Sequence, residues 1–346
     1  MQHVILAFVT ANLKMLNRLY VYIEKETEPV HNLAVESCLL NNVAEGECIL
    51  YLWQNRKTVV IGKNQNLWAQ CRPEILELEG GKAVRRLSGG GAVYHDMGNL
   101  NFTFLTHKND YDTAKQTDVV LKAVSSLGIK AEKTGRNDLT TAEGRKFSGH
   151  AYYKNGSRCY HHGTIMVDVD SDALSRYLTV SADKLKGKGV DSVRSRVVNL
   201  LELRPDLTID MLKEAMISAF EEVYGMKAEK LPESFVKPDE LAENMAFLGS
   251  DDFRLGSNMS FDQTIKNRFT WGGVEISMMV EGGFIKDAVC YSDAMREDVL
   301  SQVSGAIKGC RFATDIICGN IKNIPTDEEG KSILCDIADM LREEIQ

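Results

Sequence analysis

Hydrophobic positions along the chain fall into short runs separated by polar stretches. The run at residues 19–23 predicts a first strand. Residues 49–53 and 58–62 predict two paired strands joined by the polar turn 54–57. Apolar and polar residues alternate with a period of two over 100–105, which predicts a half-buried strand. Further strands are expected at residues 146–153 and 162–169.

Two segments carry the longer spacing of an α-helix. One helix is predicted over residues 113–127 and is ended by Gly128. Another is predicted over residues 209–224, with Thr208 as its N-cap and Gly225 just past its end. Because hairpin patterns mix with packed helices, the sequence favours an α+β fold over a doubly wound parallel sheet.

The pattern weakens over residues 232–260, where prolines and acidic residues indicate a connection between two domains. Beyond it, strand patterns at 274–280 and 284–291 are split by Glu-Gly-Gly, which predicts a hairpin. Helical patterns follow at residues 298–307 and 328–345. We therefore expect a large domain over residues 1–250, with an N-terminal extension at 1–18, and a small α+β domain over 262–346.

Composition narrows the function classes. A net charge of -8 argues against a broad nucleic-acid-binding surface. The eight cysteines form no CxxC pair and have no zinc-ligand spacing with histidine, which favours a reducing compartment. The apolar run at residues 4–9 is too short to span a bilayer. We expect a cytoplasmic protein, with mitochondrial import as the alternative because the first 22 residues carry basic but no acidic side chains.

The most informative motif is the sequence RRLSGGGAVYHD at residues 85–96. Three successive glycines, 89–91, let backbone N–H groups turn inward on an anion. Arg85 and Arg86 add planar cations suited to phosphate or carboxylate. The loop therefore predicts a phosphate-bearing ligand, although glycines that serve only a tight turn remain the alternative.

A second motif, GRNDL followed by EGRKFSGHA, places Lys146 in a strand pattern between Gly144 and Gly149. There its side chain can project into a cleft. When a carboxylate attacks the α-phosphate of ATP, negative charge gathers on the phosphoryl oxygens, and a fixed ammonium stabilises it. Lys146 is the candidate for this role; the alternative is an ordinary solvated lysine.

A third motif contains the adjacent residues His161 and His162. Neighbours on a strand point to opposite faces, so at most one of the two can line a site and they cannot readily share a metal. The other is expected to satisfy hydrogen bonds in the core.

A fourth stretch, residues 184–197, is basic and contains glycines. Its composition fits a solvated loop, and the functional alternative is a lid over an anionic nucleotide.

Taken in order, the motifs RRLSGGGAVYHD, GRNDL, RKFSGHA, HHGT and SVRSRVVNL resemble the lipoate-protein ligase A family. The resemblance extends from about residue 19 to the C-terminus and includes RFTWGG at 268–273, which is similar to part of the family's accessory domain. It implies a catalytic domain of the biotin- and lipoyl-ligase type followed by a small accessory domain.

The resemblance also implies roles for individual residues. The residues expected to bind ATP are Arg86, Gly91, Ala92, Val93, Tyr94 and Lys146. Those expected to bind lipoate are Lys146, Arg86, Gly90 and His162. Lys146 is the implied catalytic residue, Asp138 the implied magnesium ligand, and Lys188 and Arg194 belong to the implied adenylate-binding loop.

The implied activity has two steps: lipoate and ATP give lipoyl-AMP and pyrophosphate, and the lipoyl group then passes to a carrier lysine. The implied partners are the lipoyl domains of 2-oxoacid dehydrogenase E2 subunits and the glycine cleavage H protein. No nucleic acid or membrane partner is expected, and the chain is expected to act as a monomer. The acyl tunnel should be lined by valine, leucine and aromatic side chains, which the sequence does not single out.

Three alternatives stay open at this level. The first is a lipoyl or octanoyl transferase that works through a thioester or takes a preformed adenylate. The thioester route needs an activated cysteine, and Cys159 lies two residues from His161. A biotin ligase would share the fold. A non-catalytic module that captures lipoyl carriers would be expected to lack Lys146 or the glycines, and both are present.

Overall fold

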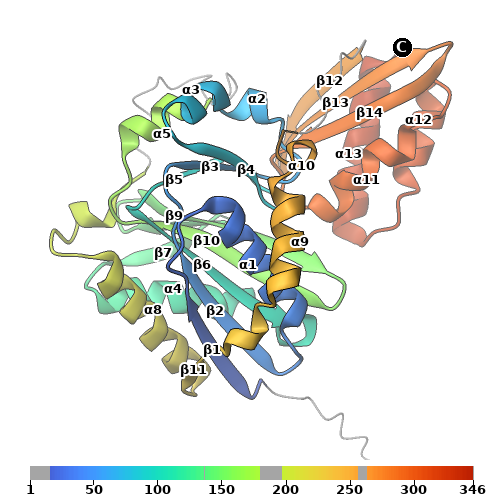
Figure 1. Ribbon diagram of the computed structural model, residues 1–346. Helices are drawn as coiled ribbons and strands as arrows, with labels where there is room; N and C mark the ends of the chain where they lie inside the picture. Colours follow the sequence, from blue (N-terminus) through green and yellow to red (C-terminus); the bar gives the residue numbers. More distant parts are fainter. Residues whose placement is uncertain (1–15, 136, 180–196, 256–262, 346) are drawn as a thin grey trace, which may run out of the picture.

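The computed structural model describes residues 16–135, 137–179, 197–255 and 263–345. Its larger sheet is formed by Arg18–Ile23 (β1), Glu47–Trp53 (β2), Asn99–His107 (β6), Ala131–Thr134 (β7), Asp138–Thr141 (β8), Lys146–Asn155 (β9), Arg158–Met166 (β10) and Ala228–Lys230 (β11). The strand order is β11-β1-β2-β6-β10-β9-β8-β7 (Figure 1). Among these strands the parallel pairs are β1 with β2 and β1 with β11, and the other pairs are antiparallel. This mixed sheet with packed helices confirms the α+β class.

A separate three-stranded sheet lies beside the large one. It consists of Lys82–Arg85 (β4), Thr58–Ile61 (β3) and Val93–His95 (β5), in the order β4-β3-β5. The predicted pairing of residues 49–53 with 58–62 is therefore wrong, because β2 pairs with β1 and β6 instead. Both segments are almost wholly buried, so their apolar runs carry no alternation that would select a partner strand.

Helices cover both faces of the large sheet. Thr113–Ser126 (α4) and Ile209–Tyr224 (α8) pack on the face that carries Leu50, Leu52 and Phe102. Pro29–Asn42 (α1) packs on the opposite face, against Tyr51 and Leu105. Strand β6 is consequently buried on both sides, and the expectation of a half-buried strand is wrong. Its polar positions, Asn99, Asn101 and Thr103, alternate with the apolar ones but are buried as well.

The helix ends follow the capping signals. The Thr208 hydroxyl accepts a hydrogen bond from the Met211 N–H at 3.2 Å, which satisfies one of the open donors of the first turn of α8. Gly225 ends this helix in the left-handed conformation, at φ 71°. Both predicted helices are confirmed.

The connection between the domains is helical rather than irregular. Pro238–Gly249 (α9) and Asp251–Leu255 (α10) occupy it, and Figure 1 shows α9 alongside α1. Pro238 stands at the first position of α9, where its missing N–H costs nothing. The helix packs through few apolar residues, chiefly Leu241, Met245 and Leu248, which explains the weak sequence pattern.

The C-terminal unit, drawn in orange and red in Figure 1, has its own hydrophobic core, formed by residues between 265 and 341. Its sheet contains Gln263–Phe269 (β12), Gly272–Glu281 (β13) and Phe284–Ser292 (β14), and its helices are Glu297–Ile307 (α11), Thr314–Lys322 (α12) and Glu328–Glu344 (α13). The predicted hairpin is confirmed as β13-β14, with both turn glycines at positive φ, 59° and 81°. Strand β12 and helix α12 were not among the predicted elements.

Short helices complete the described chain. They are Leu67–Gln70 (α2), Pro73–Leu78 (α3), Ser171–Tyr177 (α5) and the single turns Lys108–Asp110, Leu200–Glu202 and Glu233–Phe235. None of the helices in the described ranges has the length and apolar character needed to cross a membrane.

Two histidines on neighbouring strands form a buried chain of hydrogen bonds. The side chains of His161 and His150 approach to 2.9 Å between Nε2 and Nδ1. Gln116 on α4 contacts the other nitrogen of His161 at 3.1 Å, and the Ser148 hydroxyl contacts that of His150. Burial lowers the pKa of both rings, that of His150 to about 3. Both histidines are therefore neutral at pH 7, and His161 belongs to the core.

This chain predicts sensitivity to acid. Below pH 6.5 the unfolded state binds protons on these rings, whereas the folded state does not until about pH 3, so stability falls with pH over this window. At pH 5 the His150 ring alone should lower the free energy of unfolding by about 2 kcal/mol. Urea unfolding at pH 7.5 and pH 5 measures the loss. His150→Gln should make this loss smaller, and His107→Gln, at a partly exposed position, should not. An equal loss in all three proteins would contradict the assignment.

Candidate functional site

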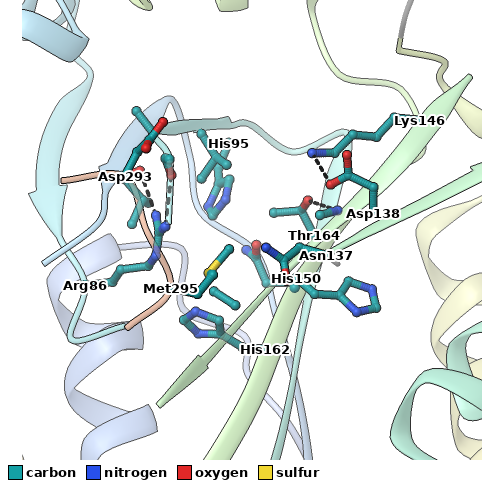
Figure 2. Close-up of a pocket in the computed structure, with 18 of the residues that line it drawn as sticks. Arg86, His95, Asn137, Asp138, Lys146, His150, His162, Thr164, Asp293 and Met295 are labelled. Carbon is teal, nitrogen blue, oxygen red and sulfur yellow. Dashed lines mark hydrogen bonds and ion pairs between the residues drawn. The ribbon is translucent and has the colours of Figure 1, made fainter. Parts of the chain in front are cut away.

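A cavity of about 390 Å³ lies where the large sheet, the small sheet and the C-terminal unit meet (Figure 2). It is within the size range of small-molecule sites. Its apolar wall includes Leu33, Trp53, Val60 and Val93, which fits the expected composition of an acyl tunnel. Its polar lining includes Arg86, His95, Asn101, Asn137, Asp138, Lys146, His162, Thr164, Arg268 and Asp293.

One row of paired residues runs across the large sheet under the cavity. The strand registers align Asp138 with Gly149, Gly149 with Thr164, Thr164 with Asn101 and Asn101 with Trp53. All five residues line the cavity. Because adjacent strands lie about 4.8 Å apart, Asp138 and Asn101 are separated by roughly 14 Å along this row. The cavity is thus elongated, with an ionic end and an end near Trp53.

The ionic end carries a lysine and an aspartate. The Lys146 ammonium lies 2.7 Å from the Asp138 carboxylate, and about two fifths of each side chain is exposed (Figure 2). The Lys146 carbonyl accepts a hydrogen bond from the Val198 N–H, which fixes the start of β9. A Cβ atom at Gly149 would lie 3.1 Å from the lysine nitrogen, so the glycine leaves room for it. Lys146 projects into a cleft, as the sequence predicts.

Arg86 holds the glycine loop from within. Its guanidinium donates to the carbonyls of Val60, Gly89 and Gly91 at 2.6 to 3.2 Å and to the Ser88 hydroxyl at 3.0 Å. Burial lowers its pKa to about 10, so it stays charged at neutral pH. Its acceptors in the described chain are all uncharged oxygens. The loop is therefore braced by a buried cation that lines the cavity and attracts anions.

Arg85 does not reach the cavity. Its guanidinium donates to the carbonyls of Gly62, Lys63 and Gln65 in one loop and to Phe253 and Arg254 in α10. Neighbouring strand residues point to opposite faces, and the two arginines follow that rule. The expectation that both arginines serve the ligand is wrong for Arg85, which instead ties the connection to the small sheet.

The C-terminal unit occupies a backbone donor of the glycine loop. The Gly90 N–H donates to the Ala294 carbonyl at 3.0 Å, and the Gly89 N–H lies near enough to the Glu297 carboxyl to favour its ionised form. A Cβ atom at residue 89 would lie 2.4 Å from the Ala294 oxygen, so only glycine allows this approach. The Gly90 amide, one of those predicted to hold an anion, is thus bonded to the protein itself in this arrangement. A phosphate that used it would have to displace the segment 294–297.

A hydrogen-bonded chain connects the loop to the sheet through His162. The Ser88 hydroxyl lies 2.8 Å from Nε2 of His162, and Nδ1 of this ring lies 2.9 Å from the Glu36 carboxylate. A carboxylate only accepts hydrogen bonds, so the Nδ1–H of His162 donates to Glu36, and the Ser88 hydroxyl, which Arg86 also contacts, shares the second hydrogen bond of the ring. The order resembles that of a hydrolase triad. Ser88 is fully buried and does not line the cavity, so the chain positions His162 rather than supplying a nucleophile.

The structure brings most predicted site residues together. Arg86, Gly91, Ala92, Val93, Asp138, Lys146 and His162 all line the cavity. Gly90 lies behind its neighbours, at φ 89°, and does not line it. Tyr94 does not line it either, because it points to the other face of β5 and packs against Tyr177. Lys188 and Arg194 lie outside the described residues.

Several lining residues were not predicted. Val93 lines the cavity, and alternation along the strand puts His95 on the same side. The position of His95 could therefore have been predicted from the sequence. Asn101 follows only from the strand register. Arg268, Asp293 and Met295 come from the C-terminal unit, and no local pattern indicates that this unit closes the cavity.

The magnesium assignment rests on Asp138 alone. The described residues contain no group of three histidines, cysteines or acidic residues that could hold a metal ion. Magnesium commonly binds through one or two carboxylates together with substrate phosphates, so a single carboxylate at the ionic end is compatible with a nucleotide-borne ion.

The comparisons with known proteins agree with this fold. Residues 28–221 match the lipoyl protein ligase A/B catalytic domain, and residues 258–341 match the bacterial lipoate protein ligase C-terminus. Fold and site together define a lipoyl-ligase-type catalytic domain with a small C-terminal domain. The chain belongs to the lipoate-protein ligase family.

Solved structures resemble the whole chain or its larger part. P. falciparum LipL1 in complex with lipoate is 28% identical, with a TM-score of 0.82, over 94% of this chain and 99% of that one. The bipartite lipoate protein ligase of Thermoplasma acidophilum, described with its E2 lipoyl domain, is 25% identical, with a TM-score of 0.62, over 72% and 100%. A lipoate-protein ligase A bound with ATP, 24% identical over 70% and 99%, with a TM-score of 0.61, shares the fold.

Glu297 makes the contact between the two units dependent on pH. Burial raises the pKa of its carboxyl to about 7, whereas in the unfolded chain it ionises near 4.5. Burying the ionised carboxyl therefore lowers the free energy of unfolding as the pH rises above 4.5, and this loss reaches its full size above pH 7. Glu297→Gln keeps an acceptor for Gly89 and should raise the free energy of unfolding by up to about 3 kcal/mol at pH 8.

Thermal unfolding at pH 8 and pH 5 tests this. The increase in the free energy of unfolding caused by Glu297→Gln should be large at pH 8 and small at pH 5. Glu328→Gln is the matched control, because Glu328 is also the first residue of its helix but is exposed. An equal gain at both pH values would contradict the proposed cost of burying the charge.

Proposed function

We propose that this protein is an ATP-dependent lipoate-protein ligase that forms lipoyl-AMP and then transfers the lipoyl group to a carrier lysine. The observation that carries the proposal is the position of Lys146 and the buried Arg86 on one elongated, partly apolar cavity. Charge for an acyl-phosphate and space for an acyl chain occur together there. The P. falciparum relative was solved with lipoate, which supports the same substrate here.

In the first step, a carboxylate oxygen of lipoate attacks the α-phosphorus of ATP. The bond from this phosphorus to the bridging oxygen breaks, and pyrophosphate leaves. Lys146 stabilises the charge on the phosphoryl oxygens, assisted by the field of Arg86. The Lys146 ammonium must turn from Asp138 toward the phosphate, which frees a carboxylate. When bound to the phosphates of ATP, magnesium would supply charge neutralisation, with Asp138 as its protein ligand.

In the second step, the carrier amine attacks the acyl carbon and AMP leaves with the bonding electrons. The amine must first lose a proton. His162 is a poor acceptor for this proton, because Ser88 and Glu36 engage both of its nitrogens. The residues around the mixed anhydride serve chiefly to hold it and to exclude water.

The carrier lysine needs a route to the acyl-adenylate. A second cavity, of about 820 Å³, lies between the catalytic domain and the C-terminal domain. It shares Asn137, Arg268, Asp293 and Met295 with the first cavity, so the two adjoin. We assign the approach of the carrier lysine to this opening. Lipoyl domains of E2 subunits and the glycine cleavage H protein are the proposed carriers, and the archaeal relative was described with an E2 lipoyl domain.

The alternatives have less support. A thioester route would need a reactive cysteine, but Cys159 is almost fully buried and its burial raises the pKa of its thiol. A biotin ligase is disfavoured by the match of both domains to lipoyl and lipoate ligases. A purely binding module would not need a cationic side chain at position 146.

The direct test is incubation of the protein with ATP, magnesium, lipoate and an apo carrier domain, followed by intact mass. The proposal expects the carrier to gain one lipoyl group only when ATP is present. Biotin in place of lipoate should give no addition. Lipoylation from preformed lipoyl-AMP, with none from lipoate and ATP, would replace the ligase proposal with a transferase.

Lys146→Met should lower the rate of lipoyl-AMP formation roughly 100-fold, because a fixed charge on the phosphoryl oxygens is lost. Pyrophosphate release with lipoate and ATP measures this step. Lys122→Met is the matched control, since Lys122 lies on α4 in a surface ion pair with Glu222. Unchanged pyrophosphate release by a folded Lys146→Met protein would remove the catalytic assignment.

Cys159→Ala should leave ATP-dependent lipoylation within about twofold of the wild type, because a buried neutral thiol takes no part in the chemistry. Transfer to the apo carrier, followed by intact mass, measures the effect. Loss of transfer in a variant with unchanged thermal stability would instead favour the thioester route.

A further inference from the structure

The C-terminal domain places an arginine in the first cavity. Arg268 lies one residue before the end of β12 and lines this cavity together with Lys146 and Arg86. Among the described residues, these three are the lysine and arginine side chains that line it. Two of them come from the catalytic domain and one comes from the C-terminal domain, so both domains contribute to the positive charge of the cavity.

Arg268 is held in the same way as Lys146. Nη1 of its guanidinium lies 3.2 Å from the Asp293 carboxylate, as the Lys146 ammonium lies 2.7 Å from Asp138. The other oxygen of Asp293 accepts a hydrogen bond from the Gly273 N–H at 2.7 Å. A Cβ atom at Gly273 would lie 3.2 Å from Nη1 of Arg268, so the glycine leaves room for the guanidinium. About half of the Arg268 side chain is exposed, which leaves it able to turn toward a ligand.

The two ion pairs flank the cavity. Figure 2 shows Asp293, the partner of Arg268, across the cavity from Lys146. A triphosphate that lay between them would meet a cation on each side. Opposite walls that each carry a cation suit a ligand with several negative charges, because one ammonium alone neutralises only part of such a ligand.

Arg86 is less available for direct contact with a ligand. All three nitrogens of its guanidinium donate to oxygens of the glycine loop or of Val60, so it acts chiefly through its field. The proposed function places Lys146 on the α-phosphoryl oxygens. Charge also builds up on the pyrophosphate as its bond to the α-phosphorus breaks, and this charge needs a cation of its own. Among the described residues that line the cavity, Arg268 is the remaining lysine or arginine.

We propose that Arg268 is a catalytic residue of the first step, supplied by the C-terminal domain, and that its guanidinium turns from Asp293 to bind the β- and γ-phosphates of ATP. The inference rests on the proposed function. When the lipoate oxygen bonds to the α-phosphorus, the bond to the bridging oxygen breaks and its electron pair stays on the pyrophosphate. Arg268 offsets this charge, and its planar N–H donors match two phosphate oxygens.

The position of Arg268 also separates the two steps of the reaction. Arg268 and Asp293 line the second cavity as well, so the pyrophosphate leaves toward the opening assigned to the carrier lysine. The transfer step uses neither the pyrophosphate nor its cation. A change at Arg268 should therefore slow the formation of lipoyl-AMP and spare the transfer from preformed lipoyl-AMP.

Arg268→Met in the full-length protein tests this with three measurements. Pyrophosphate release from lipoate, ATP and magnesium should fall roughly 100-fold, as expected when a donor aimed at transition-state charge is removed. Binding of ATP with magnesium, measured by titration calorimetry, should weaken roughly tenfold. Transfer from preformed lipoyl-AMP to the apo carrier should stay within about twofold of the wild type.

Lys266→Met is the matched control, because Lys266 lies two residues before Arg268 on β12 and does not line the first cavity. It should keep all three values of the wild type. Arg268→Lys keeps the charge without the planar donors and should recover part of the lost rate. Because Arg268 is half exposed and pairs within its own domain, Arg268→Met should melt within about 3 °C of the wild type.

Unchanged pyrophosphate release and ATP binding in a folded Arg268→Met protein would overturn the inference. Equal losses of adenylate formation and of transfer would also overturn it, because they would indicate a structural role. If the wild type forms no lipoyl-AMP, the proposed function fails and the ATP titration decides the inference. Weaker ATP binding by Arg268→Met than by Lys266→Met would then support it, and equal binding would overturn it.

Discussion

The site depends on a single buried cation. The Arg86 guanidinium holds the turn at residues 88–91 by donating to three backbone carbonyls and one hydroxyl. A glycine-rich loop without this brace would have too many accessible conformations to present one surface to a ligand. The same guanidinium is positively charged, and its hydrogen-bond acceptors within the described residues are all uncharged. Its field reaches the cavity, and the Ser88–His162–Glu36 chain transmits its position to β10 and α1.

The C-terminal domain contributes to the site in a second way. It supplies Arg268, Asp293 and Met295 to the cavity, its Ala294 carbonyl accepts a hydrogen bond from the Gly90 amide, and its Glu297 carboxyl lies near Gly89. Those contacts stabilise the loop in the arrangement described here. They also occupy a donor that an anionic ligand could use, so ligand and domain compete for it. A carboxyl that ionises near neutrality, Glu297, is part of that contact, and the balance between the two occupants therefore depends on pH.

Much of the fold follows from local patterns, because caps and turns have local causes. Thr208 and Gly225 define a helix, and the glycines at 282 and 283 define a hairpin, without reference to distant residues. Strand pairing is different. Residues 49–53 and 58–62 are buried on both faces, and nothing in their sequence says that they belong to different sheets.

The site residues also divide into those that local sequence indicates and those that depend on the arrangement of distant strands. Lys146 and the glycine loop are recognisable because unusual residues stand at short spacing. Tyr94 was assigned to the ligand although alternation along β5 turns it toward Tyr177. Asn101 looks like any polar residue of a strand, and its role emerges only when four other strands bring their own residues into its row. Arg85 has the same chemistry as Arg86, and only the direction of its side chain separates their functions.

The most direct measurement of the central claim is a crystal structure with a non-hydrolysable lipoyl-adenylate analogue. We expect the phosphate-equivalent group to lie within hydrogen-bond distance of the Lys146 nitrogen. We also expect the acyl chain to follow the row from Asp138 toward Trp53. An analogue bound outside the cavity, with the Lys146–Asp138 pair intact and exposed to solvent, would contradict it.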